Sequence, residues 1–198
     1  LHDKKDEISE ILKYINDLYT VYTNLIFFDK NGKVIAVSNR NEEFLVGRVL
    51  TQDWVSKTLS LKDTSKYCVS KFEKTVLYDN QSTYIYSSAI RSLKNEAITT
   101  GGIAIVFDSK PQFNAMLEET LPKNNEGEKI PGVFALFTNK DKQIISSTNE
   151  DFEVDSYLNI EDSFFTLKNA EKLSKIIELN GKYYAIAVKC SSGYREYK

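Results

Sequence analysis

Catalysis usually needs histidine, cysteine or paired acids, and this 198-residue sequence offers few of these groups in usable arrangements. Its only histidine, His2, stands at the N-terminus, which argues against Ser-His-Asp and Cys-His arrangements and most metal chemistry. Cys68 and Cys190 lie far apart and form no C-x-x-C pair, so no zinc site is expected. Phosphate-binding and dinucleotide-binding glycine motifs are absent. We therefore expect a protein that is not an enzyme and has neither a metal nor another cofactor.

Side chains suited to binding a small molecule are more frequent. In a strand expected at 83–92, alternation places Tyr84, Tyr86 and Ser88 on one face. Together with Trp54 in a nearby helical segment, the tyrosines could bury an apolar body and hydrogen-bond its polar ends. The alternative is that these rings pack in the core or at a sheet edge, with their hydroxyls at the surface.

Three cations could pair with an anionic ligand in this region. Arg91 is the best candidate for gripping a carboxylate with two hydrogen bonds, and Lys57 or Lys71 could add charge. The alternative for each of them is an ordinary solvated surface cation.

The composition favours a folded chain with no affinity for nucleic acid. A net charge of −2, with lysine and glutamate mixed along the chain, provides no basic stripe for phosphates. An apolar content of 41% over this length allows one large core or two of about 100 residues each. The two cysteines are either free thiols or a disulfide, if two modules bring them together. No apolar run reaches the ~20 residues of a membrane span.

Both helices and strands are needed to position these candidate binding residues. The first segment has the apolar spacing of an amphipathic helix, and an Asn-Gly turn then separates two strand-like runs. The module reads β-β-α-β-β-β, an antiparallel α+β fold. The expected elements are a helix at 3–22, strands at 24–28 and 33–38, a helix at 51–59 with Thr51 as its N-cap, and strands at 66–77, 83–92 and 101–107.

The pattern then starts again, which indicates an internal duplication. A short helix at 112–121 and a polar linker at 123–131 precede strand-like runs at 132–137 and 143–149. Phe28 and Phe137 differ by 109 positions and Asn39 and Asn149 by 110, which suggests one residue added in the turn. Residues 181–188 resemble 83–90, and the last strand of the second module is expected after Lys198. We expect a helix at 1–23 and modules at 24–122 and 132–198.

The runs FFDKNGKVIAVSN, VGRVLTQDW, YIYSSAIRS and GGIAIVFDSKPQFNAML, after an amphipathic helix, resemble the double Cache (dCache, tandem PAS-like) sensor domains of bacterial chemoreceptors. The resemblance covers nearly the whole chain. It implies two PAS-like modules on a long helix, with a ligand pocket in the membrane-distal first module. One subgroup binds amino acids through Arg-x-Trp-Tyr, a later Tyr and a later Asp. Trp54, Tyr67 and Asp108 stand near those places, but Gln52 and Val55 replace the Arg and the second aromatic residue.

We therefore expect the extracytoplasmic input domain of a chemoreceptor or sensor kinase. Its partner would be an amino acid, an organic acid or a similar metabolite, bound in the first module and signalled through the long helix. A homodimer through that helix is possible, and membrane attachment would lie in segments outside this chain. The alternatives are a ligand-free dimerisation module and a cytoplasmic PAS-type signalling domain.

Overall fold

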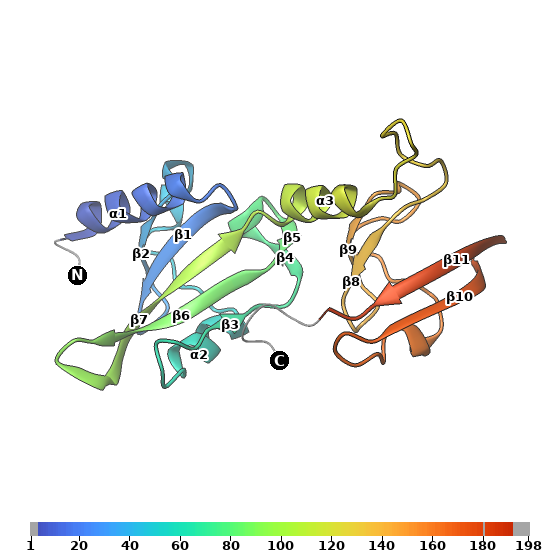
Figure 1. Ribbon diagram of the computed structural model, residues 1–198. Coiled ribbons are helices and arrows are strands. Elements are labelled where there is room, and N and C mark those ends of the chain that lie inside the picture. Colours follow the sequence, from blue (N-terminus) through green and yellow to red (C-terminus); the bar gives the residue numbers. More distant parts are fainter. Residues whose placement is uncertain (1–3, 180, 192–198) are drawn as a thin grey trace. The chain divides into compact units, whose positions relative to one another are not determined.

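The computed structural model describes residues 4–179 and 181–191, and the expectation placed on His2 lies outside them (Figure 1). The chain divides into two compact units, Leu1–Gln112 and Phe113–Lys198. The predicted fold, α+β with antiparallel sheets and an N-terminal helix, is confirmed. No helix in the described ranges is long and apolar enough to cross a membrane.

The N-terminal helix α1 spans Lys5–Leu18 and is shorter than predicted. At 1.5 Å per residue its 14 residues extend about 21 Å. Tyr19 adopts an extended conformation, and Tyr22, which the helical pattern included, already begins strand β1. The β-branched and aromatic residues after Leu18 favour a strand over a further helical turn.

The first unit is built on one five-stranded antiparallel sheet with the order β2-β1-β7-β6-β3. Two short strands, β4 and β5, form a separate hairpin beside it. The elements are β1 (Tyr22–Asp29), β2 (Val34–Val37), the 3₁₀ helix η2 (Arg40–Leu45), α2 (Asp53–Leu59), β3 (Cys68–Val69), β4 (Glu73–Thr75), η3 (Val76–Tyr78), β5 (Gln81–Thr83), β6 (Ile85–Ser92) and β7 (Asn95–Phe107).

Each face of this sheet has its own helix (Figure 1). Each face also has its own apolar core. Helix α1 covers one face, where Leu12 packs among residues such as Phe27 and Ile35. Helix α2 covers the opposite face, where Trp54 packs among residues such as Phe28. Because side chains alternate along a strand, the neighbours Phe27 and Phe28 serve different cores.

Several predicted boundaries were wrong in this unit. The expected strand 66–77 is interrupted after Val69, so β3 and β4 are separate and η3 follows. The expected strand 83–92 is divided between β5 and β6, and β7 starts at Asn95 instead of 101. The N-cap of α2 is Gln52, whose side chain makes no capping hydrogen bond, and not Thr51.

A pair of glycines lets β7 pass close to β1. A Cβ atom at Gly101 would lie 2.1 Å from the carbonyl oxygen of Phe28. At Gly102 it would lie 2.4 Å from the Phe28 ring. Any side chain at either position would collide with β1, so the fully buried Phe28 ring occupies space that β7 leaves free.

The second unit consists of two antiparallel hairpins, and helix α3 crosses the division between the units. The predicted linker 123–131 lies in this unit as an ordered turn, in which Asn124 accepts hydrogen bonds from the amides of Glu126 and Glu128. The elements are α3 (Ser109–Thr120), β8 (Leu136–Thr138), β9 (Ile144–Ser147), η4 (Asp162–Phe164), β10 (Lys172–Leu179) and β11 (Lys182–Lys189).

Hydrogen bonds of the two leading hairpins repeat at an offset of 110 residues. The Ser38 hydroxyl accepts from the amide of Leu25 at 2.8 Å, and the Thr148 hydroxyl accepts from that of Ala135 at 2.9 Å. Each hairpin also has a register irregularity at the matching step, Phe27/Phe28 and Phe137/Thr138. This agreement supports the duplication.

The turns of these hairpins match at the same offset. Asp29 accepts from the amide of Lys33 at 3.0 Å, and Asn139 accepts from that of Gln143 at 3.0 Å. No residue has been added in the turn, because Asp29 corresponds to Asn139 and Phe27 to Phe137. The expected pairing of Phe28 with Phe137 was therefore wrong by one position.

Candidate functional site

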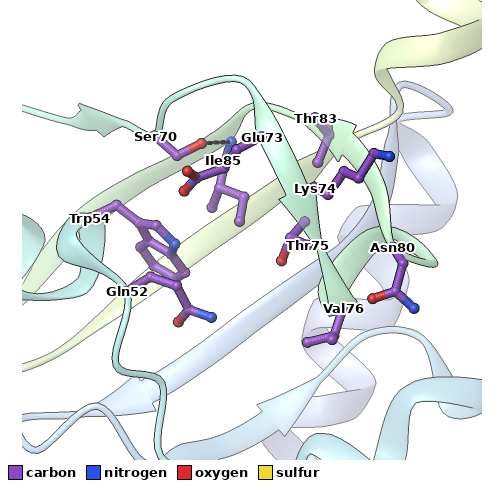
Figure 2. Close-up of a pocket in the computed structure, with 10 residues that line it drawn as sticks. All are labelled: Gln52, Trp54, Ser70, Glu73, Lys74, Thr75, Val76, Asn80, Thr83 and Ile85. Carbon is purple, nitrogen blue, oxygen red and sulfur yellow. Dashed lines mark hydrogen bonds between the residues drawn. The ribbon is translucent and has the colours of Figure 1, made fainter. Parts of the chain in front are cut away.

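A cavity of about 210 Å³ opens beside α2 in the first unit (Figure 2). Buried side chains form its floor, and exposed side chains of the β4–β5 hairpin and η3 stand at its rim. The lining residues are Gln52, Trp54, Ser70, Glu73, Lys74, Thr75, Val76, Asn80, Thr83 and Ile85.

Trp54 is the aromatic part of the floor and is held from two sides. The residue is only 3% exposed, and its ring meets the Phe28 ring edge to face, with centroids 5.8 Å apart. Its helix is tied to β6 by the buried Thr58 hydroxyl, which lies 2.6 Å from the Ser87 hydroxyl. Trp54 is thus a fixed surface on which a ligand could rest.

Close packing of α2 on the β1–β2 turn depends on Gly32. This residue has a φ of +77°, and a Cβ atom there would lie 2.8 Å from the carbonyl oxygen of Leu50 and 3.3 Å from Val55. A side chain would push the segment that leads into α2 away from the sheet. The Asn-Gly pair therefore shapes the hairpin and also allows α2 to close over it.

The opposite wall is a tight turn with its own capping. The Thr75 hydroxyl accepts from the amide of Leu77 at 3.2 Å at the start of η3. Asp79 and Asn80 then adopt left-handed conformations with φ of 50° and 57°, which Asn and Asp tolerate best after glycine. The chain returns in β5, where Thr83 pairs with Glu73.

Polar groups in this cavity lack partners within the described ranges. Gln52 Oε1 is buried and accepts no hydrogen bond. The Glu73 carboxylate forms no ion pair or hydrogen bond with any described residue, and the same holds for the Trp54 indole N–H. A buried polar atom without a partner costs about 1–3 kcal/mol, which a ligand could remove.

Of the predicted binding residues, only Trp54 lines this cavity. In β6, Ile85 pairs with Val106 on the α2 side, whereas Tyr86 pairs with Ile105 on the α1 side. Tyr84, Tyr86 and Ser88 therefore lie on the sheet face opposite to Trp54, and Tyr67 lies beside Tyr86. The expectation that the tyrosines and the tryptophan share one pocket was wrong.

The tyrosines instead form part of an aromatic cluster at the β3–β6 end of the sheet. The rings of Tyr84 and Phe72 lie 5.2 Å apart, and those of Tyr86 and Phe107 lie 6.2 Å apart. Burial raises the pKa of Tyr84 to about 12 and also raises that of Tyr86. Both hydroxyls therefore stay neutral at physiological pH.

The predicted charged residues also have other surroundings. Arg91 donates to the carbonyl oxygens of Glu96, at 2.7 Å, and Leu61, so it braces two loops. Asp108 accepts from the Tyr78 hydroxyl at 2.6 Å. Burial, followed by this hydrogen bond, raises the pKa of Tyr78 to about 12.

Neither of the two remaining predicted cations lines the cavity: Lys71 is exposed, and so is Lys57 on α2. Lys57 lies near Cys68, whose thiol pKa is raised by burial despite the lysine charge. Cys68 and Cys190 are both free thiols. No group of three or more His, Cys, Asp or Glu side chains in the described part of the chain could hold a metal ion.

Sequence reasoning missed most of the cavity wall. Glu73 and Thr75 fall in the range 66–77, which was predicted as one strand, and Asn80 lies between that strand and the next predicted one at 83–92. Their usable signal was the mixture of Thr, Asp and Asn around 75–80, which favours caps and turns over a continuous strand.

In the second unit, side chains fill the place that follows the duplicated hairpin. Phe164 in η4 is 2% exposed, and Lys142 lies 5.6 Å from the Phe165 ring and donates to the carbonyl oxygen of Ile160 at 3.0 Å. Lys142 also pairs with Asp162. Lys142 stands at the position that Gly32 has in the first unit.

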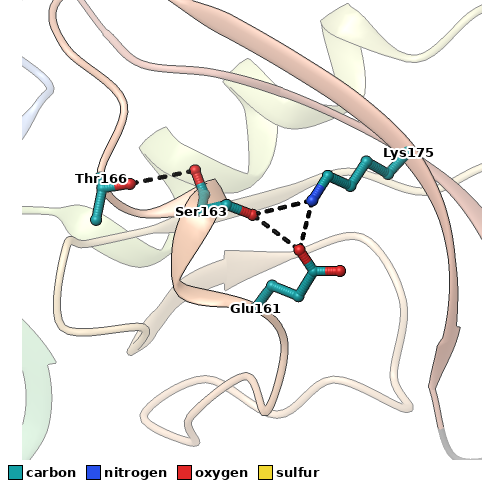
Figure 3. A network of polar contacts seen from close by, with 4 residues as sticks. All are labelled: Glu161, Ser163, Thr166 and Lys175. Atoms are coloured by element: carbon teal, nitrogen blue, oxygen red, sulfur yellow. Dashed lines mark hydrogen bonds and ion pairs between the residues drawn. The ribbon is translucent and has the colours of Figure 1, made fainter.

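A second lysine ties the same segment to β10 (Figure 3). Lys175 pairs with Glu161 and contacts the Ser163 hydroxyl at 3.3 Å, while that hydroxyl donates to Glu161 at 3.0 Å. The ammonium group lies 5.7 Å from the Phe164 ring. These contacts are exposed and hold the η4 segment in place.

Comparison with known proteins gives matches only among solved structures. No family profile and no curated protein matches the sequence. The sensor domain of the Vibrio cholerae histidine kinase DctB aligns with a TM-score of 0.54 and 16% identity over 76% of this chain and 50% of its own. The chain therefore spans about half of that structure.

Two further structures align over more of this chain. An extracellular ligand binding receptor from Desulfohalobium retbaense has a TM-score of 0.63 and 15% identity over 90% of this chain and 32% of its own. The sensory domain of the Campylobacter jejuni chemoreceptor Tlp3 has a TM-score of 0.60 and 18% identity over 96% of this chain and 74% of its own. The chain has the fold of the Cache-type sensor domains found in histidine kinases and chemoreceptors.

Proposed function

We propose that this chain is an extracytoplasmic, non-catalytic sensor domain that binds a small molecule in the cavity beside Trp54. The observation that carries the proposal is the cavity itself, with an aromatic floor and polar lining groups that have no partner among the described residues. Sensor domains of the same fold support the role, and the extracellular description of one of them supports the location. The binding set keeps Trp54 from the sequence prediction and adds Gln52, Glu73 and Asn80.

Signalling would follow from a shift in population between two arrangements of the first unit. Trp54 contacts Phe28 on β1, and the next residue, Phe27, packs in the core beneath α1. A ligand that moves Trp54 would thus act on α1 through one strand. The size of the response is limited by the difference in the ligand's affinity for the two arrangements.

Thermal or urea denaturation against amino acids, organic acids, amines and purines tests the proposal. A ligand at 100 times its dissociation constant should raise the free energy of unfolding by about 2.7 kcal/mol. Trp54→Phe should weaken this effect, whereas Tyr86→Phe, on the other sheet face, should preserve it. Equal losses in both variants, or no stabilisation by any member of the panel, would count against binding at this cavity.

A second candidate function, self-association, is favoured by the outer surface of α1. Ile11, Tyr14 and Leu18 lie on one side of the helix and are 55%, 67% and 61% exposed. Only part of the predicted apolar stripe, including Leu12, packs on the sheet. The exposed part could pair with a second copy, as the dimerisation hypothesis requires.

Sedimentation at several protein concentrations tests self-association. A dimer that dissociates on dilution is expected, and Ile11→Glu with Leu18→Glu should shift it to monomer. Lys13→Glu, a charge change at an exposed position on another side of the helix, is the matched control and should leave the dimer intact. A monomer at every concentration would exclude this function for the chain itself.

A further inference from the structure

At the exposed rim of the cavity stands the negative charge of Glu73, which pairs with no described residue. Glu73 and Thr75 project from the same side of β4, and the intervening Lys74 projects from the other side. Figure 2 shows the Lys74 ammonium directed away from Trp54, whereas the Glu73 carboxylate lies on the Trp54 side. The carboxylate has neither an ion pair nor a hydrogen-bond donor among the described residues. A ligand carrying a positive charge would supply both.

A second acceptor lies at the other end of the cavity. Figure 2 shows the Gln52 amide and the Glu73 carboxylate on either side of the Trp54 indole. Gln52 Oε1 is buried without a donor, so a hydroxyl or amino group that it meets through a small rotation of the Gln52 side chain would satisfy it. Between the two acceptors the surface is apolar, formed by Trp54 and Ile85.

The cavity volume suits a small ligand. About 210 Å³ is larger than the roughly 150 Å³ of an engineered cavity that binds benzene, so the space accepts a molecule of at least about six non-hydrogen atoms. A short chain of that size could place its carbons on the indole and one polar group at each end. An ammonium group near the indole face would gain a cation–π attraction as well.

We propose, building on the sensor function, that the ligand is a small organic cation with an amino group at one end and a hydroxyl or second amino group at the other. The amino group pairs with the Glu73 carboxylate, and the distal group donates to Gln52 Oε1. The carbons between them lie on Trp54. Organic acids are disfavoured, because a carboxylate at the same place would face Glu73.

Three probes of nearly equal size and different charge test this ligand class. They are 4-aminobutan-1-ol, a cation, butane-1,4-diol, which is neutral, and 4-hydroxybutanoate, an anion. Trp54 is the only tryptophan of the chain, so its indole N–H gives a single nitrogen-correlated proton resonance. Each probe is titrated into the full chain, and the shift of this resonance gives its dissociation constant. We expect the cation to bind at least about fivefold more tightly than the other two probes.

Two substitutions that each remove one negative charge separate the cavity charge from the general field of the protein. Glu73→Gln should weaken binding of 4-aminobutan-1-ol about five- to tenfold, since it removes the charge but keeps the shape. Glu43→Gln, at an exposed acid of η2 that does not line the cavity, should leave the affinity unchanged. Added salt should weaken binding of the cation to the unaltered chain.

The outcomes distinguish this inference from the proposed function. Tighter binding of 4-hydroxybutanoate, or an unchanged affinity of the cation in Glu73→Gln, overturns the ligand class. The sensor function survives that result if any compound binds and Trp54→Phe weakens it. If no probe shifts the resonance and no compound in the broader panel stabilises the chain, the ligand class and the proposed function both fail.

Discussion

The two duplicated hairpins have the same backbone and different coverings. Ser38 and Thr148 make equivalent hydrogen bonds, as do Asp29 and Asn139. In the first unit the turn carries Gly32, and a two-turn helix packs on it and walls a cavity. In the second unit the turn carries Lys142, which fastens a short 3₁₀ segment.

The difference shows that the hairpin backbone is compatible with either covering. Whether space is left above the hairpin depends on the segment that covers it. A glycine with positive φ, such as Gly32, admits a close helix, whereas Lys142 adopts the same backbone conformation, with φ of 69°, and fills the space with its own side chain. A change at one turn position can therefore separate a unit with a cavity beside its covering helix from a unit in which a side chain occupies that place.

The largest expected effect comes from emptying either core. Phe28→Ala should lower the stability of the first unit, and Phe164→Ala that of the second, each by about 3–5 kcal/mol, because both rings are almost completely buried. Urea unfolding followed by Trp54 fluorescence reports the first unit, and circular dichroism reports both. Phe164→Ala should leave the fluorescence transition in place. If that transition moves equally, the units do not unfold separately and the comparison fails.

An intermediate effect is expected at the position where the hairpins differ. Gly32→Ala should lower the stability of the first unit by about 2 kcal/mol, because the new Cβ meets Leu50 at a backbone with φ of +77°. Lys142→Gly should change the second unit by less than about 1 kcal/mol, since relief of a positive φ offsets lost exposed contacts. Urea midpoints measure both. Equal losses would mean that the turn residue does not determine the covering.

The smallest expected effect is a difference between the two units in how their stability depends on pH. Hydrogen bonds from Lys175 and Lys142 lower the pKa of Glu161 and of Asp162, respectively. These acids stabilise the fold above their ordinary pKa values, 4.5 and 3.8, and the contribution is lost as the pH falls through the lowered values. Burial, opposed by a hydrogen bond from Asn24, raises the pKa of Glu42 in the first unit. Its contribution is present below pH 4.5 and is lost as the pH rises through the raised value.

Matched variants isolate these contributions in urea unfolding between about pH 3 and pH 7. Glu161→Gln should cost the second unit stability near neutrality and little in acid. Glu42→Gln should change the free energy of unfolding of the first unit more favourably near neutral pH than in acid, because the amide cannot ionise. Variant effects with the same pH trend in both units would contradict the assignment.

The sequence allowed the hairpins to be predicted because their signals are local. The turn residues Asp29 and Gly32, with apolar runs on either side, were enough to predict the first hairpin. The break between β3 and β4 and the length of β7 depend on pairing with distant strands, which no local window contains. For the same reason the helical pattern overran Leu18 into the strand at Tyr22.

The candidate site was harder to predict than the fold. Alternation along β6 correctly grouped Tyr84 with Tyr86, but it could not tell which sheet face carries the cavity. That depends on where α2 packs, and Gly32 settles this through a contact visible only in three dimensions. Glu73 was overlooked because an exposed acid resembles many other acids in this sequence until its neighbours are known.

The two glycines of β7 give the site an adjustment point outside its lining. Gly102 leaves the room in which the Phe28 ring sits, and Gly101 lets β7 approach the Phe28 backbone. The Phe28 ring in turn contacts Trp54 edge to face. Substitutions at these glycines could therefore alter the depth of the cavity without changing any residue that lines it. The shape of the cavity thus depends on residues beneath it as well as on its own lining.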